Sequence, residues 1–134
     1  VYKRQETISL ALTAAETGHL VFGTLHTSGA PNTINRIIDV FPPEQQSQIR
    51  AQIAESLHMV VTQKLFKKKD GSGRVGAFEI MLCNAPIKNL IRDAKIHQIH
   101  SVMQTATREG MMQMEKSIED LIANGTIAQS AKNE

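Results

Sequence analysis

The feature that most constrains the fold is a short, nearly continuous apolar run at Leu20–Leu25, which directly follows a helical pattern ending at Gly18. In residues 6–17 the apolar residues recur at helical spacing. An apolar run of this length is typical of a strand buried on both faces of a parallel sheet. A helix that leads into such a strand predicts a β-α-β unit. The strand expected before the helix is not in the sequence, so we expect an incomplete sheet.

The rest of the chain divides into two parts. Helices are predicted from Pro31 to Phe41 and after Pro43, and two strands at residues 60–66 and 75–82 flank a lysine- and glycine-rich hairpin loop. From Asn84, a good helix N-cap, the pattern is helical to Asn124-Gly125. We therefore predict an α/β part at residues 1–83 and a helical C-terminal subdomain at residues 84–134.

Composition excludes several classes of protein. Hydrophobic residues make up 41% of the 134 residues and charged residues 21%, a balance typical of a globular domain rather than a disordered chain. No apolar run approaches the length of a membrane span, so we expect no membrane insertion. The single Cys83 excludes an internal disulfide and a four-cysteine zinc site. A formal net charge of +2 is too small to predict nucleic-acid binding by itself.

Two polar residues follow the apolar run and are the strongest site candidates. His26 and Thr27 lie where the predicted strand ends, and ligands of open α/β sheets bind at the carboxyl ends of strands. An imidazole or a hydroxyl there can donate a hydrogen bond to a phosphate oxygen. His19 lies seven residues earlier, and this odd offset predicts opposite faces of a regular strand. A satisfied polar group at a strand end is the alternative, and spacing alone favours it.

Other polar residues carry weaker signals. Arg36 on a predicted helix could donate to a nucleotide, although surface ion pairing is the ordinary role of such a residue. His97 and His100 have a spacing suited to a metal, but no further ligand lies nearby in sequence on the same face, and we predict no metal site. The run Lys67–Lys69 could contact phosphates, whereas a solvated loop is the commoner explanation. No G-x-x-x-x-G-K-[ST] phosphate loop is present.

The segment from Glu6 to Thr27, ETISLALTAAETGHLVFGTLHT, closely resembles the His box of type II/IV secretion ATPases, in particular of the branch that retracts type IV pili. The likeness continues through residues 33–42, 63–65 and 73–81, and it covers the chain from Glu6 to about Gly125. It implies the C-terminal half of a RecA-like P-loop NTPase domain, in which His26 contacts the γ-phosphate side of the site and His19 supports that segment. Thr27 and Arg36 are implied as further contributors to the nucleotide site.

A second stretch resembles the C-terminal helix motif that retraction ATPases need for retraction as distinct from hydrolysis. Its residues are Ile87, Lys88, Asn89, Leu90, Ile91, Arg92 and Asp93, where Lys88 and Asp93 replace Arg and Glu and keep the charge signs. Relatives that drive extension or type II secretion usually carry a four-cysteine zinc motif. With Cys83 alone, the chain resembles the retraction branch.

The resemblance also implies an assembly and a location. It implies a homo-hexamer that uses ATP and Mg²⁺, acts on a pilus platform protein of the inner membrane, and lies on the cytoplasmic side of that membrane. The phosphate loop and the acidic magnesium motif are expected upstream of Glu6. We therefore expect this C-terminal segment alone to bind no nucleotide tightly, to be inactive, and to fold poorly or aggregate.

Some expectations stay open. Residues 1–5 depart from the family pattern and suggest a truncated or misjoined reading of the gene. The alternatives to a retraction ATPase segment are a segment of an extension or type II secretion ATPase, or a non-catalytic module that joins or regulates such rings. A nucleic-acid-binding domain rests only on Lys67–Lys69 and lacks aromatic platforms.

Overall fold

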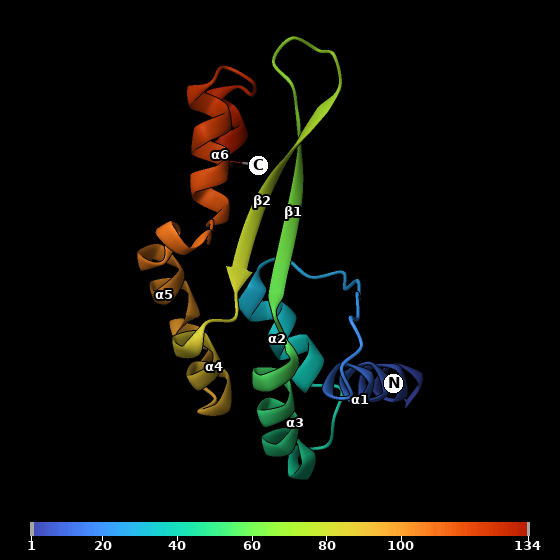
Figure 1. Ribbon diagram of the computed structural model, residues 1–134. Helices are drawn as coiled ribbons and strands as arrows, with labels where there is room; N and C mark the ends of the chain where they lie inside the picture. The colour runs from blue at the N-terminus through green and yellow to red at the C-terminus, as the bar shows by residue number, and fades with distance from the viewer. Residues whose placement is uncertain (1, 134) are drawn as a thin grey trace.

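The computed structural model describes residues 2–133, and the side chains of residues 4–133, as a long two-stranded hairpin with most helices near its base and α6 beside its far half (Figure 1). The helices and strands, in chain order, are α1 (Tyr2–Glu16), α2 (Ala30–Ile38), α3 (Pro43–Ser56), β1 (Met59–Lys67), β2 (Arg74–Leu82), α4 (Ala85–Arg92), α5 (Ile99–Thr105) and α6 (Met114–Ala123). Short 3₁₀ turns occupy residues 96–98, 107–109 and 129–133. In the part that the structure describes, no helix has both the length and the apolar character that crossing a membrane requires.

The helix boundaries confirm several signals read from the sequence. Pro31 lies in the first turn of α2 and Pro43 opens α3, where a missing N–H costs no intrahelical bond. Asn84 caps α4, because its side-chain oxygen accepts a hydrogen bond from the Ile87 N–H at 3.1 Å. The chain leaves α6 through Gly125, whose φ of 72° is a left-handed conformation that favours glycine.

The hairpin confirms the two predicted strands and extends each by a residue or more. β1 and β2 are antiparallel and in continuous register from Met59 opposite Leu82 to Lys67 opposite Arg74. Buried residues alternate with exposed ones along the strands, as expected for a sheet with one covered face. A Cβ on Gly76 would lie 2.8 Å from the Phe78 ring. Glycine at position 76 therefore leaves room for this ring, which lies over the backbone two residues earlier in β2.

Buried apolar side chains form two clusters. The larger one joins α2, α3, α4 and α5 at the base of the hairpin, and Ile34, Ile87 and Ile99 are fully buried in it. The smaller one joins the far half of the hairpin to α6, with Phe66 and Ile118 at its centre. The larger cluster includes residues on both sides of position 83, and the division into residues 1–83 and 84–134 stays a prediction.

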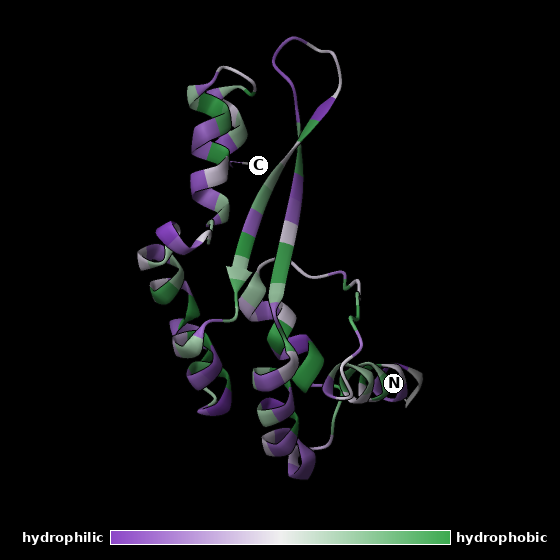
Figure 2. Ribbon diagram, viewed as in Figure 1, coloured by the Kyte–Doolittle hydropathy of each residue, from purple (hydrophilic) through white to green (hydrophobic). Residues whose placement is uncertain are grey.

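The predicted strand at Leu20–Leu25 is not formed. The chain between α1 and α2 has no regular structure, and the exposed fractions of Leu20 and Phe22 are 77% and 87%. The hydropathy colouring shows this apolar stretch on the link between the two helices (Figure 2). A strand exists only through hydrogen bonds to a neighbouring strand. In the described residues β1 and β2 pair with each other, and neither pairs with the segment.

We predict that the exposed apolar segment makes the isolated chain self-associate, because open apolar patches mark contact surfaces. Phe22→Ala should reduce self-association in light scattering and change the free energy of unfolding by less than about 0.5 kcal/mol. The matched change Phe66→Ala removes a ring that is only 2% exposed and should cost about 3–5 kcal/mol. Equal destabilisation by the two variants would contradict the structure.

Cys83 follows β2 and packs against the larger cluster. Burial raises the pKa of its thiol to about 11, although the nearby charge of Lys88 acts in the opposite direction. The thiol is therefore neutral near pH 7, and its thiolate, the reactive form, is scarce.

We predict that Cys83 reacts with a thiol reagent at pH 8 about 100-fold more slowly in the folded chain than in the urea-unfolded chain. Since the folded-state pKa lies above the ordinary thiol pKa of 9.0, the unfolded chain loses the proton first. The contribution of this thiol to stability is complete below about pH 9 and is lost as the pH rises toward 11. Cys83→Ala should remove this part of the pH dependence, and equal labelling rates in the two states would refute the burial.

Candidate functional site

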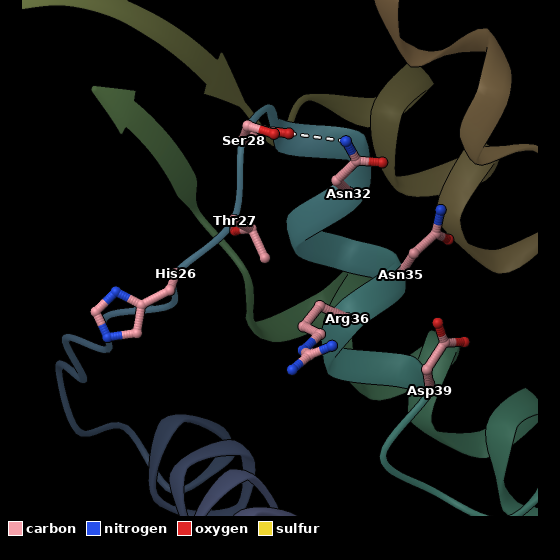
Figure 3. A pocket seen from close by; sticks show the side chains of 7 residues that line it. All are labelled: His26, Thr27, Ser28, Asn32, Asn35, Arg36 and Asp39. Carbon is pink, nitrogen blue, oxygen red and sulfur yellow. Dashed lines mark hydrogen bonds between the residues drawn. The ribbon is translucent and has the colours of Figure 1, made fainter. Parts of the chain in front are cut away.

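A surface pocket of about 440 Å³ lies between the segment that precedes α2 and one face of α2. Its lining consists of His26, Thr27, Ser28, Asn32, Asn35, Arg36 and Asp39. Figure 3 shows the first three on the incoming segment and the other four along α2. The structure thus brings together His26, Thr27 and Arg36, three residues singled out in the sequence.

Local hydrogen bonds fix the incoming segment against α2. The Thr27 and Thr33 hydroxyls are 2.7 Å apart, and the Thr33 hydroxyl donates to the Gly29 carbonyl oxygen at 2.9 Å. Because a hydroxyl has one proton, Thr27 must be the donor to Thr33. The Asn32 amide donates to the Ser28 carbonyl oxygen at 2.8 Å (Figure 3). Gly29 turns the chain into the helix with a φ of 89°, which favours glycine.

The side chains of the pocket suit an anion with several oxygens. Histidine, serine, asparagine and arginine side chains can all donate hydrogen bonds there. Arg36 is exposed and forms no ion pair with any described residue, so its guanidinium is available for a carboxylate or phosphate. Asp39 is the single acidic residue of the lining. Its carboxylate would repel an anion at the C-terminal end of α2.

His19 does not line this pocket. It lies just beyond the end of α1, where its Nδ1 is 3.2 Å from the Thr17 hydroxyl and 3.3 Å from the Ala14 carbonyl oxygen. The expectation of opposite strand faces for His19 and His26 assumed a regular strand, and that strand is absent. The contacts of His19 attach the segment to the end of α1.

The second motif forms α4 and its C-terminal end. Ile87 and Ile91 are fully buried, and Leu90 is partly buried against the same cluster. Arg92 forms an ion pair with Glu55 of α3 and donates to the Asn89 side chain at 3.0 Å. The polar residues of the motif, Lys88, Asn89, Arg92 and Asp93, are partly or fully exposed. The apolar half of the motif thus holds the helix in place and leaves the polar half open to contact.

The remaining candidates do not gather into a site. Among residues 2–133 no group of three or more histidine, cysteine, aspartate or glutamate side chains lies close enough to hold a metal ion. His100 lines a separate shallow depression with Gln104, Gln113 and Glu115. Lys67–Lys69 lie at the hairpin tip, far along the chain from the pocket.

Sequence reasoning missed Ser28, Asn32, Asn35 and Asp39. The signal for the last three was available, because polar residues at positions 32, 35, 36 and 39 recur at helical spacing opposite the buried Ile34 and Ile38. Ser28 had no signal apart from its position beside Thr27.

Comparison with known proteins gives the family. The family model described as type II/IV secretion system protein matches residues 3–132. The chain belongs to this family. It is 53% identical to a twitching motility protein of Neisseria gonorrhoeae over 126 residues, which is 94% of this chain and 34% of that protein. It is 50% identical to the type IV pilus retraction ATPase PilT of Pseudomonas aeruginosa over 96% of this chain and 37% of that protein.

The fold of this family member agrees with a solved structure. The crystal structure of the pilus retraction motor PilT with bound ADP matches 95% of this chain and 35% of that one, with a TM-score of 0.85 and 43% identity. The chain therefore has the fold of part of a RecA-like secretion ATPase, as predicted. It spans about a third of the length of the relatives it matches.

We predict opposite effects for two charge-removing changes in the pocket of this type II/IV secretion family member. Arg36→Gln should weaken binding of pyrophosphate several-fold, and Asp39→Asn should strengthen it, because one removes an attractive charge and the other a repulsive one. A titration followed through the His26 imidazole signal by NMR would measure both affinities. Equal affinity in the two variants would rule out the pocket as an anion site.

Proposed function

We propose that this chain is a segment of a hexameric motor ATPase that couples ATP binding and hydrolysis to type IV pilus retraction and twitching motility. The observation that carries the proposal is the donor-rich pocket that His26 and Arg36 line, with Thr27 beside His26, in a chain 50% identical to a pilus retraction ATPase. The C-terminal position of the segment within such a protein stays a prediction.

In this proposal the pocket faces the terminal phosphate of ATP. His26 and Thr27 lie at its rim on an exposed segment, and Arg36 presents a free guanidinium from α2. Donors placed where charge develops stabilise the transition state of phosphoryl transfer. His19 supports the same segment from the end of α1.

The phosphate loop and the magnesium ligands would come from parts of the protein outside this segment. The lining is rich in hydrogen-bond donors and has one carboxylate, Asp39, so it fits phosphate oxygens better than a divalent cation. Mg²⁺, when bound, would neutralise charge on the phosphates. This segment would contribute orientation and charge at the far side of the nucleotide, and it would neither hydrolyse ATP nor bind it tightly alone.

The proposed assembly is a homo-hexamer on the cytoplasmic side of the inner membrane, acting on the pilus platform protein. The pocket is open on the surface, which suits a nucleotide site completed by another part of the ring. Lys88 of α4 is partly exposed, Asp93 at the end of the helix is exposed, and neither forms an ion pair with a described residue, so both are available for the contact that converts ring movement into retraction. An extension or type II secretion ATPase is the second candidate, and the single Cys83 disfavours it.

The test is a chimera in which this chain replaces the matching segment of the Neisseria gonorrhoeae twitching motility protein. We expect the chimera to hydrolyse ATP and His26→Ala to lower kcat at least about 100-fold, as loss of one transition-state donor does. The matched control is His58→Ala, since His58 is exposed and does not line the pocket.

The proposal fails if the chimera folds and assembles but His26→Ala and His58→Ala keep the same kcat. Pilus retraction, measured as twitching in cells that carry the chimera, separates the motor function from hydrolysis alone. A chimera that hydrolyses ATP and supports secretion or extension in place of retraction would favour the second candidate.

A further inference from the structure

Glu79 is a buried acid for which the sequence gives no simple reason. It lies in the middle of β2, and its exposed fraction is only 2%. Its neighbours on the covered face of the strand, Ala77 and Met81, are fully buried apolar residues, and Thr62 lies opposite it on β1. Burying a carboxylate is costly unless strong hydrogen bonds or opposite charges compensate. The position therefore needs a specific partner.

The partner is the first turn of α2. One carboxylate oxygen of Glu79 accepts a hydrogen bond from the Ala30 backbone N–H at 2.6 Å. The residue before the helix is Gly29, which has no side chain to cap the free N–H groups. Glu79 acts as the cap from 49 residues away in sequence. Its negative charge also interacts favourably with the positive end of the helix dipole.

This contact lies at the turn that joins the pocket-lining residue Ser28 to α2. The same oxygen of Glu79 would be 3.7 Å from a Cβ placed on Gly29, so the carboxylate packs against the turn that leads from the pocket into α2. Gly29 in turn accepts a hydrogen bond from Thr33, and Thr33 accepts one from Thr27. A continuous set of contacts therefore runs from the hairpin through Glu79 and Thr33 to the residue next to His26.

We infer that Glu79 is a positioning residue for the nucleotide site: it holds the start of α2 against the hairpin and so sets the place of His26 and Thr27 relative to Arg36. The inference rests on the proposed function. Glu79 does not touch the pocket, and it acts through the turn at Gly29. The segment before His26 has no strand partner among the described residues, so its place depends on its C-terminal side, where the Glu79 contact and the hydrogen bonds of Thr27 and Ser28 to α2 hold it.

The test uses Glu79→Gln in the ATP-hydrolysing chimera. Glutamine keeps the shape and an acceptor oxygen but removes the charge at the helix terminus. The matched control is Glu44→Gln, which removes an exposed acid from the first turn of α3 and does not touch the pocket. We expect Glu79→Gln to lower kcat about tenfold with KM for ATP nearly unchanged, because misplaced donors affect the transition state first. Glu44→Gln should leave both constants unchanged.

A double-mutant cycle separates positioning from a structural role. If Glu79 acts through His26, adding Glu79→Gln to His26→Ala should lower kcat less than about twofold further. Effects that multiply in full would overturn the inference, as would a Glu79→Gln variant with the kcat of Glu44→Gln. If Glu79→Gln does not fold, Thr33→Val provides the same test, since it removes the hydroxyl that joins Thr27 to Gly29 at nearly constant shape. Unchanged kcat in that folded variant would also overturn the inference.

The two proposals fail in different ways. If His26→Ala hydrolyses ATP normally, the proposed role of the pocket is wrong whatever Glu79 does. If His26→Ala is inactive and Glu79→Gln is normal, the pocket stands and only the role of Glu79 is wrong.

Discussion

The antiparallel pairing of β1 and β2 is the constraint on which the rest of the structure depends. In the described residues this hairpin is the one sheet, and α2 and α6 attach to it at separate points, while α1 packs on α3 and α3 packs on α4. Ala30 of α2 bonds to Glu79, and Ser117 of α6 accepts the Phe78 N–H at 2.9 Å. The backbone of Ile80 exchanges hydrogen bonds with Met112 at 2.8 and 3.0 Å. Three consecutive residues of β2 thus hold one segment that precedes the hairpin in sequence and one that follows it.

Much of this fold could be predicted from the sequence, because helices and hairpins are specified by local signals. Pro31, Pro43 and Asn84 mark helix starts by their own chemistry, and the glycine-rich loop marks the hairpin. The segment Leu20–Leu25 shows where such reading fails. Its composition favours a buried parallel strand, yet a strand also needs a neighbour to bond with. No described residue supplies one, so a local pattern was insufficient.

For the candidate site, too, some features could be predicted from the sequence and others could not. His26 and Thr27 were found because they end an apolar run, and Arg36 because it lies on a predicted helix, whereas their meeting in one pocket required the tertiary structure. Glu79 could not have been assigned a role from spacing. β2 carries apolar residues on both faces, Ala77 and Met81 on one and Phe78 and Ile80 on the other, so the sequence does not say whether the face with Glu79 is covered. Its partner at Ala30 is distant in sequence, and the contact exists only because α2 packs at the base of the hairpin.

His26 lies close to the point where the backbone becomes attached to the hairpin. Toward the N-terminus, Leu20 and Phe22 are exposed and without strand partners, and toward the C-terminus the turn at Gly29 is held by Glu79. His26 therefore lies at the boundary between backbone anchored to the hairpin and backbone that is not. If the pocket receives a nucleotide phosphate, as proposed, this boundary places His26 where the anchored backbone begins, on the segment that faces Arg36 of α2.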